Sequence, residues 1–155
     1  MAKRGGFRTL TPSERSALMA RVRSKDTRPE LVVRRMAHRL GFRFRLHRRD
    51  IPGSPDLAFI ARRKVVFVHG CFWHSHAGCG LASVPKARPE YWLPKLERNR
   101  HRDQRTMNLL QQHGWSVLIV WECETSNTGP LAERLTDFLN NGTECQPRTR
   151  NEGET

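Results

Sequence analysis

The sequence lacks the features of a membrane or secreted protein. No apolar run approaches the roughly 20 residues that a membrane-spanning helix needs, and the first ten residues, MAKRGGFRTL, contain no hydrophobic signal core. Acidic residues are also few: 15 Asp and Glu stand against 28 Lys and Arg, which gives a net charge of +13. We therefore expect a soluble cytoplasmic protein with a polyanionic partner.

The positive charge is concentrated in the first third of the chain. Residues 1–50 carry 15 Lys and Arg against 4 Asp and Glu, whereas residues 101–155 carry 5 against 8. The basic residues are spread over expected loops and helices and do not gather on one amphipathic face. This distribution favours nucleic acid over a membrane surface as the partner.

The length of 155 residues and the hydrophobic content of 37% suit one packed domain. Internal repeats and low-complexity tracts are absent from the sequence. We expect a flexible N-terminus over residues 1–10, a single domain over 11–142 and a disordered polar tail over 143–155.

Two capping boxes predict two leading helices. The string TPSE opens a helix over about 11–24, and TRPE opens another over about 27–41, which Gly41 ends. Residues 90–113 have the pattern of a helix that is broken or kinked near Pro94, and residues 130–139 form a last short helix.

Strand patterns lie between these helices. Apolar and basic residues alternate over 42–47, which is typical of a half-buried strand. The segments 56–61 and 65–69 predict a hairpin with the basic turn 62–64, and 115–122 is an apolar strand whose two tryptophans we expect in the core. The order of elements predicts an α/β (α+β) domain, a mixed central sheet flanked by helices, with a metal-bound loop.

The sequence HGCFWHSHAGC, from His69 to Cys79, holds three histidines and two cysteines within eleven residues. Because no secretion signal is present, zinc is a better explanation for the cysteines than disulfides, and ordinary buried thiols would not explain the histidines. Cys71, Cys79, Cys123 and one histidine would make a Cys3His site, with Cys145 left over. The spacing does not decide which histidine is the ligand. The remaining histidines are candidates for acid–base chemistry.

Together with PGSPDLAFIARRKVVFV before this loop and GWSVLIVWEC after it, the sequence over about residues 15–123 resembles the very-short-patch mismatch repair endonucleases. The resemblance implies a restriction-endonuclease-like fold. It also implies nicking of one DNA strand 5′ to the thymine of a T:G mispair, which arises when 5-methylcytosine deaminates. A monomer at the bacterial nucleoid is expected, with functional links to a DNA cytosine methyltransferase and to mismatch repair factors.

Asp56 is the expected ligand of a catalytic Mg²⁺, because it opens a strand at a sheet edge and Mg²⁺ prefers carboxylate oxygens. Nucleases of this fold usually carry a second acid on the next strand, where this sequence has Phe67, Val68 and His69. The resemblance implies that the main-chain carbonyl of Val68 replaces that acid and that His69 acts near the ion. The family usually has Thr in place of Val68, a change that keeps the carbonyl.

The resemblance also assigns the other site residues. It implies that His74 is a second catalytic histidine oriented by Asp103, and that His76 is the zinc ligand. Glu30 has two interpretations, an active-site residue or only the third residue of its capping box. Between His76 and Cys79 stand two residues, one more than in the usual form of the family, and Gly78 allows a compensating turn.

The resemblance marks Phe72, Trp73 and Trp92 as a wedge that enters the duplex at the mispair. Met19 would enter from the other side of the duplex, or else pack on the core-facing side of its helix. Unstacking bases costs a few kcal/mol and is easiest at a mispair, so such a wedge favours mismatches. Two rival functions remain open: a non-catalytic zinc module that binds DNA, and a nuclease of the same fold with another DNA substrate.

Overall fold

The computed structural model describes residues 11–14, 17 and 25–141. Met19, Cys145 and both expected terminal segments lie outside these residues, so the statements made about them stay predictions. The first expected helix is described only at its start, where its capping box is formed. Thr11 Oγ1 accepts the backbone N–H of Glu14 at 3.2 Å, and Glu14 Oε2 accepts the N–H of Thr11 at 2.9 Å.

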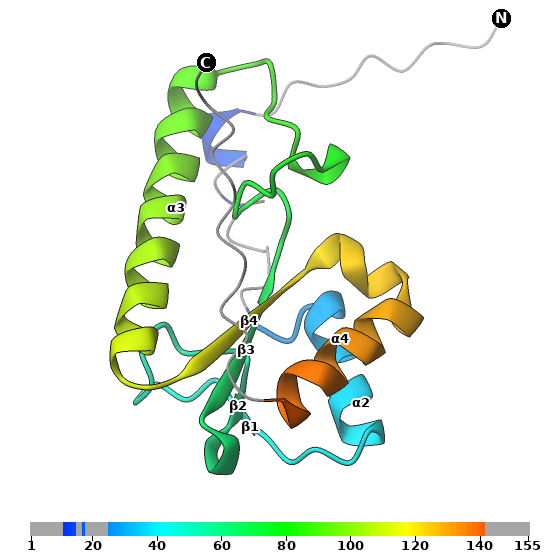
Figure 1. Ribbon diagram of the computed structural model, residues 1–155. Helices are drawn as coiled ribbons and strands as arrows, with labels where there is room; N and C mark the ends of the chain where they lie inside the picture. Colours follow the sequence, from blue (N-terminus) through cyan, green and yellow to red (C-terminus); the bar gives the residue numbers. More distant parts are fainter. Residues whose placement is uncertain (1–10, 15–16, 18–24, 142–155) are drawn as a thin grey trace, which may run out of the picture.

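One mixed sheet of four strands forms the centre of the structure, in the order β1-β2-β3-β4 (Figure 1). The strands are β1 (Arg45–Leu46), β2 (Leu57–Phe59), β3 (Lys64–His69) and β4 (Ser116–Trp121). Pairing is antiparallel from β1 to β3 and parallel between β3 and β4, with His69 opposite Trp121. Because β3 and β4 are parallel, the segments that follow them start at the same edge of the sheet.

Helices cover both faces of this sheet (Figure 1). The long helix α3 (Pro89–Gln112) makes the parallel crossover from β3 to β4 on one side. Helices α2 (Arg28–Arg39) and α4 (Thr128–Asn140) pack on the other side. The expected mixed α/β fold is therefore confirmed. Short 3-10 turns η1 (Ile60–Arg62), η2 (Gly80–Ala82) and η3 (Glu122–Ser126) complete the described chain.

Two apolar clusters follow from the alternation of side chains along the strands. The larger one lies between the sheet and helices α2 and α4, and includes Val33, Leu57, Phe59, Val66, Val120, Leu135 and Phe138. The smaller one lies under α3 and includes Ile51, Ala58, Val65, Phe67, Leu110 and Val117. Each buried Leu or Phe contributes about 1.5–3 kcal/mol to the free energy of unfolding, so these clusters hold the ends of β2 and β3 in place.

Helix α2 begins and ends as the sequence predicts. The Thr27 side chain accepts the backbone N–H of Glu30, and Gly41 follows the last turn with φ of +87°. Of the expected break or kink at Pro94, the break is wrong, because α3 runs without interruption through this residue, and the kink stays a prediction. Pro94 lies in the second turn, where its missing N–H removes a single hydrogen bond near the helix start.

Two strand predictions are corrected by the structure. The strand expected over 42–47 is reduced to β1, because Phe42 and Phe44 pack edge-on against Phe59 in the core instead of continuing the ladder. The hairpin is present, but Lys64 belongs to β3 rather than to the turn. The buried Lys64 ammonium donates to the carbonyls of Phe138 and Asn141 at the end of α4, a favourable place for a cation.

Among the described residues, no helix combines the length and apolar character that crossing a bilayer requires.

Candidate active site

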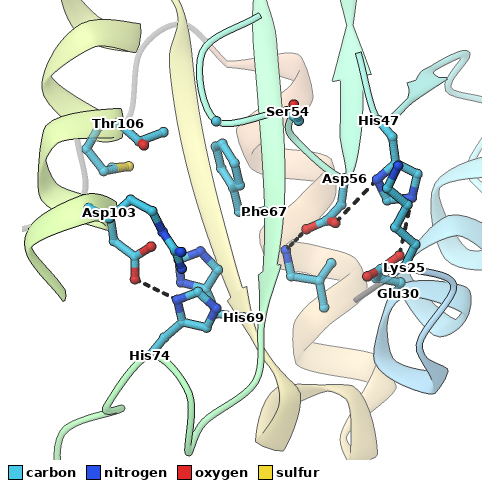
Figure 2. A pocket seen from close by; sticks show the side chains of 14 residues that line it. Lys25, Glu30, His47, Ser54, Asp56, Phe67, His69, His74, Asp103 and Thr106 are labelled. Atoms are coloured by element: carbon cyan, nitrogen blue, oxygen red, sulfur yellow. Dashed lines mark hydrogen bonds and ion pairs between the residues drawn. The ribbon is translucent and has the colours of Figure 1, made fainter. Parts of the chain in front are cut away.

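A cavity of about 420 Å³ lies between β3, α3 and the start of α2 (Figure 2). It brings together six residues that the sequence marks as catalytic or as a metal ligand: Glu30, Asp56, Val68, His69, His74 and Asp103. These residues come from two helices, two strand ends and the Cys/His-rich loop. The cavity also includes Lys25, His47 and Arg102, which the sequence did not single out.

Asp56 directly precedes β2, and its side chain is 15% exposed. Its Oδ2 accepts the backbone N–H of Val68 at 2.6 Å. Burial raises the pKa of this carboxyl to about 7; the Val68 N–H opposes the shift and the neighbouring Glu30 adds to it. Because the nearby Arg34 does not offset the cost of burial, the site suits a divalent ion with oxygen ligands.

The structure also explains why a valine can stand at position 68. Its side chain is half-buried and packs against the larger apolar cluster, away from the chemistry of its main chain. The replacement of Thr by Val therefore leaves the backbone of residue 68 beside Asp56.

His69 and His74 lie face to face in the cavity (Figure 2). Their rings are stacked with centroids 3.7 Å apart and planes 7° from parallel. His69 ends β3 and is 7% exposed, and burial lowers its pKa to about 3, so its imidazole is neutral at physiological pH. Its Nδ1 is buried and has no hydrogen-bond partner within the described part of the chain.

Asp103 on α3 orients His74. The distance from Asp103 Oδ2 to His74 Nδ1 is 2.6 Å. Burial alone would raise the pKa of Asp103, but the hydrogen bond from His74 and the neighbouring positive charges together outweigh it, and the net pKa lies below its ordinary value. Because Nδ1 of His74 is engaged by a carboxylate, Nε2 is the atom that can meet a substrate.

Glu30 both caps a helix and faces the cavity. Its backbone N–H is bound by Thr27, as in a capping box, but its carboxylate accepts the N–H of Asp26 at 3.0 Å instead of the N–H of Thr27. The side chain is 4% exposed, and Oε2 lies 3.6 Å from Nε2 of His47. Glu30 is therefore the third residue of its capping box and also lines the cavity, and its role in the active site stays a prediction.

A second group of ligands lies where the segments after β3 and β4 meet. One ligand atom from each of Cys71, His76, Cys79 and Cys123 lies within 4.8 Å of the others. The Cys123 Sγ is 3.5 Å from Nδ1 of His76, close to the separation expected between two ligands of a tetrahedral zinc ion. The geometry selects His76 as the histidine of the cluster, which the spacing alone left open.

The donor set of this cluster fits zinc. All three cysteines are free thiols in the structure. Burial raises the pKa of the Cys71 thiol to about 12, so a metal ion is the natural means of holding it as a thiolate. The additional residue before Cys79 is absorbed at Gly78, which turns with φ of +71°.

Trp121 connects this cluster to the cavity. Its ring is stacked on His76, with centroids 4.1 Å apart, and meets His69 edge-on at 5.4 Å. The expectation that both tryptophans of this strand lie in the core is met in part by Trp115, which packs against the smaller apolar cluster, and is wrong for Trp121. Trp121 is half-buried between two histidines, and Trp115 precedes β4 with the Arg63 guanidinium 4.6 Å above its ring.

The three expected wedge residues form one aromatic cluster. Phe72 contacts Trp73 and Trp92 edge-on, with centroids 5.0 and 5.3 Å apart. Phe72 and Trp73 are half-buried, whereas Trp92 is 8% exposed and lies beneath them. The sequence did not single out two neighbours: Tyr91, which is 46% exposed, and Lys95, whose ammonium lies 5.3 Å from the centroid of the Trp73 ring.

Comparisons with known proteins agree with this geometry. Residues 8–79 match the family model described as DNA mismatch endonuclease Vsr. The chain is 55% identical over 130 residues to the type II nicking enzyme V.XorIIP of Xanthomonas oryzae pv. oryzae, covering 84% of this chain and 95% of that protein. It is 40% identical over 130 residues to the DNA mismatch endonuclease Vsr of Escherichia coli, covering 81% of this chain and 83% of that protein.

The chain belongs to the Vsr family of DNA mismatch endonucleases. It is thus an endonuclease of DNA mismatch repair, a hydrolase that nicks DNA. The family match spans Asp56, both stacked histidines and the Cys/His-rich loop, while Asp103 and Cys123 lie beyond it. The cavity of this Vsr family member contains no second acid on β3, in agreement with the sequence.

Proposed function

We propose that this endonuclease nicks one strand of duplex DNA 5′ to the thymine of a T:G mispair, by Mg²⁺-dependent hydrolysis of a phosphodiester bond. One observation carries the proposal: the loop from Gly70 to Cys79 places His74 in the acidic cavity and Phe72 and Trp73 in the aromatic cluster beside it. Chemistry and recognition of a mispair would therefore take place on the same short segment.

The cavity supports hydrolysis at a metal-assisted site. The Asp56 carboxylate and the main-chain carbonyl of Val68 would hold Mg²⁺, which when bound neutralises phosphate charge and lowers the pKa of a water molecule. His74, oriented by Asp103, moves a proton at its Nε2, either from the attacking water or to the leaving oxygen. The neutral His69 stacks on His74 and presents a hydrogen-bonding imidazole to the reacting phosphate. Glu30 contributes negative charge at the edge of the same site.

The Cys/His cluster supports a structural role for zinc. Cys71, His76, Cys79 and Cys123 would close a tetrahedral site with no position left for substrate. Such a site cross-links the loop to the segment after β4 and contributes directly to folding. It would thereby fix both His74 and the wedge.

The aromatic cluster supports recognition of a mispair. Phe72 and Trp73 have exposed surface to insert between bases, and the buried Trp92 supports them from below. Met19 is proposed to enter from the opposite groove. Insertion requires unstacking, which is easiest at a mispaired step.

The wider setting follows from the same proposal. A substrate produced by deamination of 5-methylcytosine links the enzyme to a DNA cytosine methyltransferase and to mismatch repair factors. We propose that it acts as a monomer in the bacterial cytoplasm, where the duplex lies. The net charge of +13 suits this partner.

A nicking assay with end-labelled duplexes tests the proposal. We expect cleavage of one strand of a T:G duplex with Mg²⁺, little cleavage of matched T:A and C:G duplexes, and none in EDTA. The variant Asp56→Ala tests the carboxylate in the same assay. Asp50→Ala is its matched control, because Asp50 is an exposed acid paired only with Arg48 in the described structure. Binding of T:G without nicking would favour the zinc module, and nicking without T:G preference would favour another DNA substrate.

A further inference from the structure

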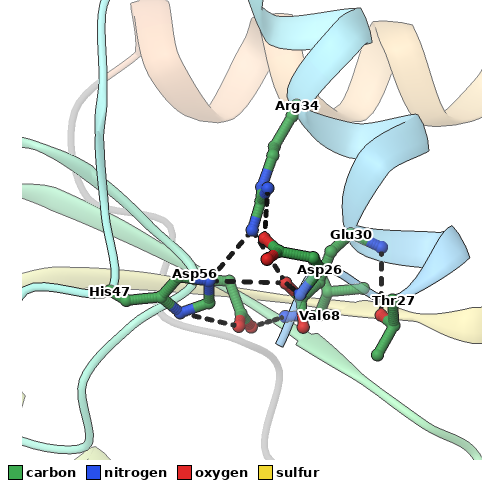
Figure 3. Close-up of polar contacts among 7 residues, drawn as sticks. All are labelled: Asp26, Thr27, Glu30, Arg34, His47, Asp56 and Val68. Atoms are coloured by element: carbon green, nitrogen blue, oxygen red, sulfur yellow. Dashed lines mark hydrogen bonds and ion pairs between the residues drawn. The ribbon is translucent and has the colours of Figure 1, made fainter. Parts of the chain in front are cut away.

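A charged cluster lies behind the Asp56 carboxylate and includes groups to which the family resemblance assigned no role (Figure 3). Glu30 and Arg34 come from α2, Asp26 precedes that helix, His47 follows β1, and Asp56 precedes β2. The cluster thus ties three separate segments together at one wall of the cavity.

Arg34 is the centre of this cluster. Its Nη1 lies 2.7 Å from Asp26 Oδ1, and its Nη2 lies 3.0 Å from Glu30 Oε2 and 2.9 Å from Nε2 of His47. Asp26, Glu30 and His47 are close enough together to hold a metal ion. The guanidinium already supplies the cation between them, so this group is an extension of the Asp56 site and not a separate metal site.

The contact with Arg34 determines which ring nitrogen of His47 carries the proton. A guanidinium can only donate hydrogen bonds, so Nε2 of His47 must accept and Nδ1 must carry the proton. That Nδ1 faces Asp56 Oδ1 at 3.9 Å, while Asp56 Oδ2 is held by the N–H of Val68 at 2.6 Å. N–H groups therefore face both oxygens of Asp56: the N–H of Val68 forms a hydrogen bond, whereas Nδ1 of His47 makes a longer electrostatic contact outside hydrogen-bond distance.

The backbone at His47 agrees with a positioned side chain. Its φ is +46°, in the left-handed region, which is uncommon and strained for a residue with a β-carbon. This conformation turns the imidazole, which is 16% exposed, inward between Glu30 and Asp56. The contacts of the His47 ring with Glu30 and Asp56 offset the strain of this backbone conformation.

We propose that His47 and Arg34 are positioning residues for the nicking reaction. Arg34 sets the tautomer of His47, and His47 holds the Asp56 carboxylate in the orientation that binds the catalytic cation. The inference rests on the proposed Mg²⁺ role of Asp56. Groups that orient a metal ligand in this way change metal affinity by about 10–100-fold when removed.

The first test measures nicking of a T:G duplex against Mg²⁺ concentration for the wild type, His47→Ala and His47→Gln. We expect His47→Ala to raise the half-saturating Mg²⁺ concentration about tenfold or more, and to approach the wild-type rate at saturating Mg²⁺. His47→Gln keeps a donor and an acceptor, so it should recover most of the affinity. His101→Ala is the matched control, because His101 is exposed on α3 and pairs with Glu97.

The second test does not depend on activity. Long-range proton–nitrogen NMR distinguishes the two tautomers of each histidine, and the spectrum of His47→Gln identifies the His47 signals. We expect protonated Nδ1 in the wild type and a shift toward protonated Nε2 in Arg34→Ala. Arg34→Met keeps most of the side-chain volume but has no hydrogen-bond donor, so it provides the same comparison if Arg34→Ala does not fold.

The outcomes separate the two proposals. A wild type that does not nick T:G duplexes with Mg²⁺ contradicts the proposed function. If the wild type nicks and His47→Ala shows the same Mg²⁺ dependence, the inference is overturned. It is also overturned if His47→Ala loses rate equally at all Mg²⁺ concentrations together with a lower Tm, because that pattern indicates only a structural role. A wild-type His47 protonated at Nε2 contradicts the role of Arg34.

Discussion

The Cys/His cluster and the Asp56 cavity lie at the same end of β3, yet they suit cations in opposite ways. The cluster offers three thiols and one imidazole that could close a tetrahedron, whereas the cavity offers the carboxylates of Glu30, Asp56 and Asp103 around open space. A closed site contributes to folding, and an open one leaves room for water and phosphate. We therefore expect that loss of an ion from the cluster damages the structure, while loss of an ion from the cavity abolishes the chemistry and leaves the protein folded.

The largest expected effect is on the open site. Asp56→Asn removes the carboxylate that would hold Mg²⁺, so nicking of a T:G duplex should fall by at least about 10³-fold. Gel-shift affinity for the same duplex should stay close to that of the wild type, because the wedge and the basic surface are unchanged. Nicking at the wild-type rate would remove Asp56 from the active site.

The same substitution should have a pH-dependent effect on stability. Burial raises the pKa of Asp56 to about 7 in the folded protein, so the folded state binds more protons than the unfolded state between about pH 4 and 7, and stability falls as pH rises through that range. Without Mg²⁺, Asp56→Asn should therefore have a higher Tm than the wild type at pH 8, and the gain should disappear near pH 4. A Tm difference that does not change with pH would contradict the buried, uncompensated carboxylate.

Substitutions in the Cys/His cluster should have the opposite effect, a loss of stability. Cys71→Ser, Cys123→Ser and His76→Ala should each lower bound zinc, measured by elemental analysis, and lower the Tm by several degrees or more. Cys145→Ser is the matched control and should change neither quantity. A zinc-free wild type that melts normally would remove the structural role of the metal.

A smaller effect is expected at the wedge. Trp73→Ala should lower the preference for T:G over T:A duplexes in binding and nicking, with zinc content unchanged. Trp92→Ala should lose the same preference and also lose about 3–5 kcal/mol of stability, because its side chain is buried. Leu109→Ala, at an exposed position on α3, is the control for both. A Trp73→Ala variant with undiminished T:G preference would separate the aromatic cluster from recognition.

The smallest effect concerns charge outside both sites. Arg35 and Arg39 are exposed on α2, and changing both to Gln should reduce the slope of log affinity against log salt by about 1–2, with no change in the preferred mispair. Arg134→Gln, where the native residue is paired with Glu124, should leave the slope unchanged. A changed preference at constant slope would mean that Arg35 and Arg39 read bases.

Local patterns in the sequence predicted the parts of this architecture that are local in the chain. The cap at Thr27, the end of α2 at Gly41 and the Cys/His-rich loop all depend on neighbouring residues. Cys123 could also be predicted as a member of this cluster, because the strand before it was expected to end beside the loop. Pro94 was misjudged because a proline early in a helix removes only one hydrogen bond.

The parts that the sequence did not reveal depend on convergence of distant segments. Arg34 and His47 have ordinary sequence surroundings, and only packing of α2 against the chain after β1 brings His47 to Arg34 and Glu30, and close to Asp56. The contact of Trp121 with His76 and His69 likewise depends on the parallel register of β3 and β4. A positively charged residue one helical turn after Glu30 was the sole local signal for Arg34.

The most direct test of the two-site account is to remove Mg²⁺ from protein whose zinc content is measured before and after dialysis. The account predicts that zinc content, the folded state and T:G binding are retained while nicking is lost, and that added Mg²⁺ restores nicking fully. Continued nicking by zinc-loaded protein free of Mg²⁺, or loss of zinc or unfolding at the assay temperature on removal of Mg²⁺ alone, would contradict the division between a structural and a catalytic ion.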